Sequence, residues 1–473
     1  MRLKSVTLNN FRCFESLTLD LDPRLTVIVG ENGAGKTAVL DGIASGLTPV
    51  LTQLSSADQR LAGRGIKDSD FRLQALPGMR KSQWSTADYA QIMTTTFGGL
   101  RWDYWRPSGG GKGKKPAQTW GETALKEHLN ALTESYKTEN PALTPVFTYY
   151  GASRGHIEVP ERLRSAKNTY EHPTAALVDC FNPRSDFREM LAWFDQEESS
   201  ELRANKGLSG EEYEPFHSLE AVRATVVSLL GGAFRNPQFN ARHKFVLERA
   251  SDGAELLVSQ LSQGYQSMLA LAIDFARRLA IANRHAEYGN VHAVQQLSYH
   301  ASSVLEPHDP GIHAPFQHAL AMSAPAIMLV DEIDLHLHPT WQQRVLDDLM
   351  RTFPMTQFIV TTHSPQVLTS VRREKIRILE QHEGRMRVRT PDFSPLAHES
   401  GDALTKIMGT HREPPLPLQD DIRQYEQLVR EGKEHTETAQ TLRTTLQQAG
   451  YQFHESDLAT WRFLAQRSAG KEH

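Results

Sequence analysis

The amino-acid sequence predicts an α/β fold with a mixed sheet whose strands end in chemically active groups. Three apolar runs, 25–29, 326–330 and 357–362, are continuous rather than alternating, which is typical of strands buried on both faces of a sheet. A glycine-rich turn follows the first run, two acids end the second, and a histidine follows the third. Apolar residues at helical spacing come after the glycine-rich turn, so a helix follows that strand.

The composition is that of a globular protein with two or three domains. Of 473 residues, 39% are hydrophobic, and no apolar run approaches the ~18 residues of a membrane helix. Two cysteines exclude a disulfide framework and a zinc quartet. A net charge of −4 argues against a protein that coats nucleic acid by bulk charge. With no signal peptide at the N-terminus, we expect a cytoplasmic protein that does not contact a membrane.

Residues 30–37 form the most specific motif. Gly30-Glu-Asn-Gly-Ala-Gly-Lys-Thr37 lies between a buried strand and a helix, which is the context of a phosphate-binding P-loop. Backbone N–H groups would face the phosphates, Lys36 would reach the β- and γ-phosphates, and Thr37 would bind Mg²⁺. An ordinary glycine-rich turn is the alternative, but it does not require the Lys-Thr pair. The residues expected to bind ATP are Asn32, Gly33, Gly35, Lys36, Thr37 and Ala38.

A second acidic motif ends the next buried run. Asp331 suits a ligand of Mg²⁺, and Glu332 suits a general base that orients and polarises the attacking water. His363 follows the third run, where an imidazole can hydrogen-bond a phosphate oxygen or that water. The alternatives are a helix cap for the acids and a structural role for the histidine.

A further anion-binding pattern opens a helix with an apolar face. A predicted hairpin over 244–258 leads into Leu261-Ser-Gln-Gly264. Ser262, Gly264 and the first N–H groups of the helix would face negative charge. The alternative is an ordinary N-cap at Ser262.

These four elements occur in the order seen in ATP-binding-cassette (ABC) ATPases, and the sequence resembles the soluble RecF/SMC-like branch of that superfamily, in particular its OLD-type group. The resemblance is carried by Asn10-Phe-Arg12, Tyr150-Gly-Ala-Ser-Arg154, Leu261-Ser-Gln-Gly-Tyr-Gln-Ser267, Asp331-Glu-Ile-Asp-Leu-His-Leu-His-Pro339 and Thr362-His-Ser-Pro365. It implies a head-to-tail homodimer that encloses two ATP molecules, with Ser262 of one subunit facing the P-loop of the other. It also implies slow turnover, Arg12 near the phosphates and Asp334 at the dimer interface.

One departure from the family pattern bears on hydrolysis. ABC ATPases usually have a glutamine that ligates Mg²⁺ after a strand in the first half of the chain. Here the predicted strand 147–150 runs into Gly-Ala-Ser-Arg154. Either Ser153 or Arg154 does a related job, or the chain binds ATP with impaired hydrolysis.

The resemblance also implies a domain organisation. The ABC-type core would comprise 1–50 and 240–400, with an inserted helical and mixed subdomain over 51–239 and a helical extension over 401–473. The tail has no Asp-x-Asp pair for a metal-dependent TOPRIM nuclease, so the chain is not expected to cut DNA itself. Its apolar stripes must dock, either on the ATPase core or at a subunit interface.

An OLD-like ATPase with such a tail is similar to the PtuA ATPases of Septu antiphage systems, which pair with a separate HNH nuclease, PtuB. The first hypothesis is therefore a defence ATPase that assembles with itself and with an HNH nuclease, DNA being the target of the complex. The second is a RecF-like repair ATPase that binds DNA directly. The third is a scaffold that senses ATP with little hydrolysis.

Overall fold

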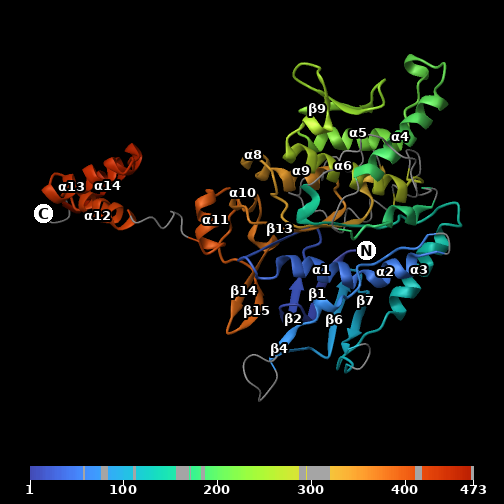
Figure 1. Ribbon diagram of the computed structural model, residues 1–473, viewed down its shortest axis with the longest axis horizontal. Coiled ribbons are helices and arrows are strands. Elements are labelled where there is room, and N and C mark those ends of the chain that lie inside the picture. The colour runs from blue at the N-terminus through green and yellow to red at the C-terminus, as the bar shows by residue number, and fades with distance from the viewer. Residues whose placement is uncertain are drawn as a thin grey trace. The chain divides into compact units, whose positions relative to one another are not determined.

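The computed structural model describes residues 1–56, 59–75, 84–109, 113–155, 170, 172–182, 187–286, 295, 320–410 and 418–469. These form two compact units, 1–408 and 409–473, which we describe separately. The predicted α/β class is confirmed in the first unit (Figure 1). Among the described residues, no helix has the length and apolar character needed to span a bilayer.

A six-stranded mixed sheet forms the centre of the first unit. Its strand order is β15-β14-β3-β13-β12-β8, and all neighbours are parallel except β15, which runs antiparallel to β14. The strands are β3 (Leu25–Gly30), β8 (Val146–Tyr150), β12 (Ala326–Val330), β13 (Thr356–Thr361), β14 (Ile376–His382) and β15 (Arg385–Arg389). The three runs predicted as buried strands are β3, β12 and β13, and they are direct neighbours.

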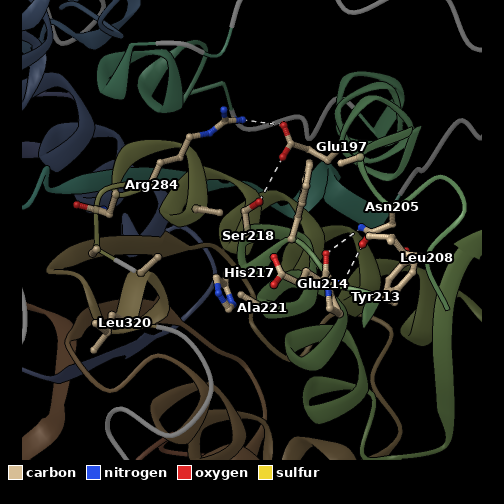
Figure 2. A pocket seen from close by; sticks show the side chains of 17 residues that line it. Glu197, Asn205, Leu208, Tyr213, Glu214, His217, Ser218, Ala221, Arg284 and Leu320 are labelled. Carbon is tan, nitrogen blue, oxygen red and sulfur yellow. Dashed lines mark hydrogen bonds and ion pairs between the residues drawn. The ribbon is translucent and has the colours of Figure 1, made fainter. Parts of the chain in front are cut away.

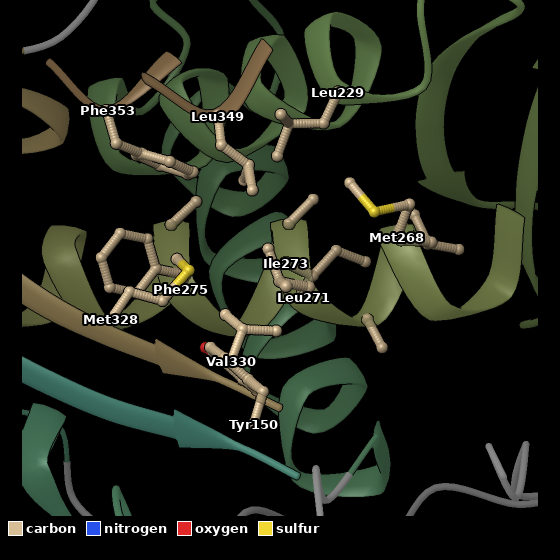
Figure 3. Close-up of a cluster of buried hydrophobic side chains, with 14 of the residues drawn as sticks. Tyr150, Leu229, Met268, Leu271, Ile273, Phe275, Met328, Val330, Leu349 and Phe353 are labelled. Carbon is tan, nitrogen blue, oxygen red and sulfur yellow. The ribbon is translucent and has the colours of Figure 1, made fainter. Parts of the chain in front are cut away.

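Alternate residues of these strands enter two different hydrophobic cores. Ile327 and Leu329 pack in the core that contains the helix after the P-loop, α1 (Lys36–Gly46). Met328 and Val330 pack in the other core, with α6 (Gln263–Ala282) (Figure 3). Because both faces are covered, β12 is apolar at every position and β3 and β13 are buried along nearly their whole length, which explains the continuous runs in the sequence.

A second, antiparallel sheet covers α1. Its order is β2-β1-β6-β7, with β1 (Leu3–Phe11), β2 (Phe14–Asp20), β6 (Tyr89–Thr96) and β7 (Arg101–Pro107). The approach is close, since a Cβ at Gly42 would lie 2.6 Å from Leu8 Cδ2 and one at Gly46 the same distance from Ile92 Cγ2. Glycine at these two helical positions therefore sets the distance between α1 and the sheet.

The predicted 51–239 insertion does not form a separate subdomain in this structure. β6 and β7 complete the antiparallel sheet, and β8 is an edge strand of the central sheet, beside β12. Strand partners are set by tertiary pairing across long sequence separations, which local composition does not encode.

α2 and α3 pack in the same core as α1, whereas α4, α5 and α9 pack in the core that contains α6. Large side chains from α5, α9, β8 and β12 surround the apolar face of α6, including Tyr150, Leu229, Leu349 and Phe353 (Figure 3). The other helices and strands of this unit are α2 (Thr48–Leu54), α3 (Thr123–Ser135), α4 (Phe187–Ala204), α5 (His217–Leu229), α8 (Pro339–Gln342), α9 (Val345–Thr352), α10 (Pro365–Leu368), α11 (Ser400–Lys406), β4 (Leu73–Ala75), β5 (Trp84–Thr86), β9 (Phe234–Phe239), β10 (Phe245–Arg249) and β11 (Glu255–Leu257).

The second unit is helical, as the sequence predicts for the tail. It contains α12 (Gln419–Arg430), α13 (Glu437–Gln448) and α14 (Glu455–Ala469). The stripes of the three helices form a small core of their own, in which Tyr425 and Leu446 are fully buried. α11 belongs to the first unit, so the two units separate at 408/409 rather than at the predicted 400/401.

Candidate nucleotide-binding site

The P-loop occupies the turn between β3 and α1. Gly33 and Gly35 have φ values of 84° and 94°, which L-residues with a side chain adopt at a cost. A Cβ at Gly35 would also lie 2.6 Å from the Phe14 ring and 2.7 Å from Cys13 Sγ. The predicted residues Asn32, Gly33 and Thr37 are exposed, while Ala38 is buried at the start of the helix. The loop therefore presents backbone and polar groups at the end of a buried strand.

Lys36 lies across this loop. Its Nζ donates hydrogen bonds to the carbonyl oxygens of Gly30 at 2.8 Å and Glu31 at 3.0 Å. The side chain is buried, and burial lowers its pKa, while Asp331 and then Glu332 act in the opposite direction. Both present partners are neutral carbonyls, so a phosphate oxygen would bind the ammonium more strongly than they do.

Thr37 and Asp331 are brought together although 294 positions separate them. Thr37 Oγ1 donates to Asp331 Oδ2 at 2.8 Å, and Thr361 Oγ1 donates to Asp331 Oδ1 at 2.6 Å. Because β3, β13 and β12 are parallel neighbours, their carboxyl ends meet at one edge of the sheet. A hydroxyl and a carboxylate oxygen at this distance form the kind of donor set that Mg²⁺ prefers.

Glu332 adopts a left-handed backbone conformation, with φ of 51°. For a residue with a side chain, this conformation costs about 1–2 kcal/mol. Hydrogen bonds hold it on both sides, since Thr361 Oγ1 accepts from the Glu332 amide at 2.8 Å and the Glu332 carbonyl accepts from the Leu335 amide at 2.9 Å. Strained residues held in this way concentrate at active sites.

Asp334 organises the turn after β13. Its Oδ1 accepts from Thr362 Oγ1 at 2.6 Å and from the His363 amide at 3.3 Å. His363 is partly exposed at the end of β13, so its imidazole lies at the same sheet edge as Asp331. Asp334 therefore joins the turn after β12 to the start of the His363 segment.

Arg12 is held by two carboxylates. Its guanidinium lies 2.6 Å from Asp41 Oδ2, on α1, and 2.8 Å from Asp70 Oδ1. Arg64 contacts the same two acids. The next residue, Cys13, touches the P-loop at Gly35, which brings the Arg12 turn to the loop. A contact between Arg12 and phosphate stays a prediction.

Ser262 caps the N-terminus of α6. Its hydroxyl is exposed and accepts from the Tyr265 amide at 3.5 Å, a long bond. Gly264 is buried, and a Cβ there would lie 2.7 Å from the His336 carbonyl oxygen. The turn after Asp331 and Glu332 thus packs directly on the start of α6. No hydrogen bond recorded for the described residues joins Ser262 to the P-loop of its own chain.

Sequence analysis left the role of one buried residue of the site open and missed a second. Arg154, left open as a glutamine substitute, is buried and donates to the backbone carbonyls of Asp331 and Glu332. On α6, Asp274 is buried and accepts from the Tyr150 hydroxyl at 2.8 Å. Arg277 and Arg278 pair with the same carboxylate. An aspartate followed at i+3 and i+4 by arginines inside an apolar helix was the available signal.

A cavity of about 820 Å³ lies apart from these groups, between α4, α5 and the C-terminal half of α6 (Figure 2). Glu197, Asn205, His217 and Arg284 are among its lining residues, and Glu197 pairs with Arg284 at 2.7 Å. None of the residues predicted to bind ATP lines it. The candidate nucleotide site is instead the open edge of the sheet where β3, β12 and β13 end.

Comparisons with known proteins agree with this geometry. Residues 5–213 match the family model "AAA domain", and residues 182–369 match "AAA domain, putative AbiEii toxin, Type IV TA system". The chain is 24% identical over 496 residues to the Retron Vc95 probable ATPase of Vibrio cholerae, covering 94% of this chain and 87% of that protein. These matches support an ABC-type ATPase related to the retron ATPases.

Further relatives place this ATPase among similar proteins. The Retron Ec83 probable ATPase of Escherichia coli is 26% identical, with 95% of this chain and 84% of the relative covered. Septu protein PtuA of Bacillus mycoides is 26% identical, but over 37% of this chain and 21% of its own length. The likeness to Septu PtuA is therefore partial, while that to the retron ATPases extends along nearly the whole chain.

Proposed function

We propose that this ATPase hydrolyses ATP as a subunit of an antiphage defence complex, in which ATP-dependent head-to-tail dimerisation assembles and regulates a separate HNH nuclease. The observation that carries the proposal is the hydrogen bond between Thr37 and Asp331, because it joins the P-loop to the acidic strand end in one oxygen-rich site. The retron ATPases and PtuA support the defence role by their similarity to this chain.

Each predicted residue has a role in this proposal. Lys36 and the loop N–H groups, from Asn32 to Ala38, bind the β- and γ-phosphates. Thr37 and Asp331 would hold Mg²⁺, which neutralises phosphate charge when bound. The described residues contain no cluster of three or more His, Cys, Asp or Glu side chains suited to a metal. Two protein oxygens completed by phosphate and water match the usual environment of Mg²⁺.

Glu332 and His363 act on the attacking water. Glu332 would accept its proton as a general base, and the fixed backbone on both sides of Glu332 limits the positions of that carboxylate. His363 would hydrogen-bond the γ-phosphate or the water, with Asp334 holding its backbone. Turnover of ATP is expected to be slow, because each hydrolysis event serves to reopen the dimer.

Dimerisation follows from the position of Ser262. In one chain the serine is exposed at a helix N-terminus that carries partial positive charge. We propose that it contacts the γ-phosphate bound by the P-loop of a second copy, with Arg12 and Asp334 near the same interface. The helical second unit is the proposed docking region for the nuclease partner, and DNA is the target of the complex.

The test begins with phosphate release by the purified chain. Mg²⁺-dependent release that is lost in Glu332→Gln supports the ATPase function, whereas release unaffected by that change contradicts it. Co-expression with an HNH nuclease encoded beside the gene should yield a complex of defined mass. If no such complex forms, the nuclease part of the proposal is wrong, while the ATPase part stands or falls on phosphate release.

A second candidate is a nucleotide-sensing scaffold, favoured by the Gly-Ala-Ser-Arg154 sequence where a glutamine is usual. It predicts tight ATP binding with no phosphate release from the wild-type chain. Equilibrium binding of a fluorescent ATP analogue, measured beside phosphate release on the same preparation, separates the two candidates.

A further inference from the structure

Arg154 lies directly behind the acidic strand end. It follows β8 in a short helical turn, Ala152–Gly155, and only 4% of its surface is exposed. One of its terminal nitrogens donates to the carbonyl oxygens of Gly151, at 3.3 Å, and of Asp331. The other donates to the Glu332 carbonyl at 2.5 Å. A single guanidinium thus bridges two consecutive carbonyls of the strand end that carries both acids.

The surroundings of Arg154 keep this group charged. Burial lowers the pKa of its guanidinium to about 10, although Asp331, Asp334 and Glu332 each favour the charged form. The group is therefore a cation at neutral pH. Its contacts go to backbone oxygens, so the Asp331 and Glu332 carboxylates stay available for Mg²⁺ and water.

We propose that Arg154, which lies where ABC ATPases usually have a glutamine, is a positioning residue for ATP hydrolysis: it holds the backbone of Asp331 and Glu332 in the conformation that aims the Glu332 carboxylate. The inference rests on the proposed ATPase function and deepens it. Arg154 touches neither phosphate nor Mg²⁺ in this account, and it acts through Glu332.

The choice of arginine follows from geometry. A guanidinium is planar and presents diverging N–H donors at fixed angles, so it can bridge two carbonyls without losing further rotational freedom. The lysine ammonium is a compact point charge that would contact one carbonyl well. The Glu332 backbone has a left-handed conformation, which must be held in place by its neighbours. A rigid bridge between the Asp331 and Glu332 carbonyls does this better than a contact to one carbonyl.

The experiment compares Arg154→Ala and Arg154→Lys with the wild-type chain. Arg2→Ala is the matched control, since Arg2 is also buried and donates to a backbone carbonyl, that of Met355 at 3.0 Å. We expect Arg154→Ala to lower kcat by about 100-fold, the cost typical of misplacing a catalytic group by ~1 Å. ATP affinity should change less than about threefold, and Arg154→Lys should lose about tenfold in kcat.

Chemical rescue distinguishes positioning from a purely structural role. Millimolar guanidinium ion should restore part of kcat in Arg154→Ala, and it should not raise kcat in Arg2→Ala. Thermal unfolding of both variants controls for lost stability. Wild-type kcat in Arg154→Ala would overturn the inference while leaving the ATPase function intact. Equal losses of kcat and ATP affinity, without rescue, would overturn it as well. A wild-type chain that releases no phosphate would overturn both proposals.

Discussion

The candidate nucleotide site has two halves, the sheet edge and the start of α6. A single chain completes the first half further than the second. At the sheet edge, Lys36, Thr37 and Asp331 already make defined hydrogen bonds with loop or strand-end groups. At the start of α6, Ser262 is exposed and makes one long hydrogen bond to its own helix. In the first half, the groups proposed to bind the triphosphate are already held in place by one chain, whereas in the second half the helix N-terminus is exposed.

This difference follows from where each half sits in the fold. Parallel strands place the P-loop and the acids side by side through the hydrogen-bond register of the sheet. The N-terminus of α6 packs through Gly264 on the turn at His336, so its outer surface faces away from its own packing partners. We infer that closure around ATP needs a second copy, and the predictions below test that asymmetry.

The largest effect is expected in the first half. Lys36→Ala removes the ammonium that would bind the β- and γ-phosphates, in a buried position. Loss of one partner of a buried charged contact costs about 4 kcal/mol, so ATP affinity should fall about 1000-fold. Equilibrium binding of a fluorescent ATP analogue measures it, with the exposed Lys433→Ala as control. Affinity within threefold of wild type would contradict the P-loop assignment.

Glu332→Gln should separate binding from chemistry in the same half. The amide keeps the shape of the side chain but cannot accept the proton of the attacking water, so kcat should fall about 100-fold. ATP affinity should be unchanged or higher, and the ATP-bound dimer should persist. Phosphate release and mass measurement in solution check both points. A comparable loss in Glu374→Gln, which removes an exposed acid, would show that the effect is not local.

Ser262→Arg tests the incomplete half. A bulky cation at the helix start should prevent closure with a second copy, so ATP-dependent dimerisation is lost and hydrolysis falls at least about tenfold. ATP binding to each monomer should be retained. Thr436→Arg is the matched control, because Thr436 likewise caps an exposed helix start, that of α13. Dimers and hydrolysis at wild-type levels in Ser262→Arg would rule out the head-to-tail arrangement.

The three buried strands that end at the candidate site were predictable from the sequence for a physical reason. β3, β12 and β13 are buried on both faces, so their continuous apolar runs and polar ends can be recognised in the local sequence. The partners of β6, β7 and β8, which lie within 51–239, are set by pairing across long separations, and local composition does not encode them. The site residues themselves stay predictions until nucleotide binding is measured.

Arg154 and Asp274 show a second limit of sequence reasoning. A buried arginine looks like a surface residue in a sequence, since its partners are backbone carbonyls that carry no sequence signature. Asp274 interrupts the apolar face of α6 and is tolerated because Arg277, Arg278 and Tyr150 satisfy its oxygens. Burial opposes its ionisation, but Arg278 and Arg277 outweigh burial and hold its pKa at about 2.

The smallest expected effect concerns the connection between the two halves. The Tyr150 hydroxyl donates to Asp274 of α6 at 2.8 Å, while the Tyr150 carbonyl accepts from the Asp331 amide at 2.8 Å. Tyr150 thus contacts both the helix that carries Ser262 and the strand that carries the acids. Tyr150→Phe removes a hydrogen bond to a charged group and should cost about 2 kcal/mol of unfolding free energy, measured by denaturant titration.

Tyr149→Phe is the matched control for Tyr150→Phe. Tyr149 lies on the same strand but on the opposite face, in the core that contains α1. If the two halves communicate through Tyr150, only Tyr150→Phe should weaken the dependence of hydrolysis on dimerisation, by a few-fold in the protein concentration at half-maximal rate. Equal changes in both variants would mean that the two halves are joined by ATP and the second copy rather than through β8.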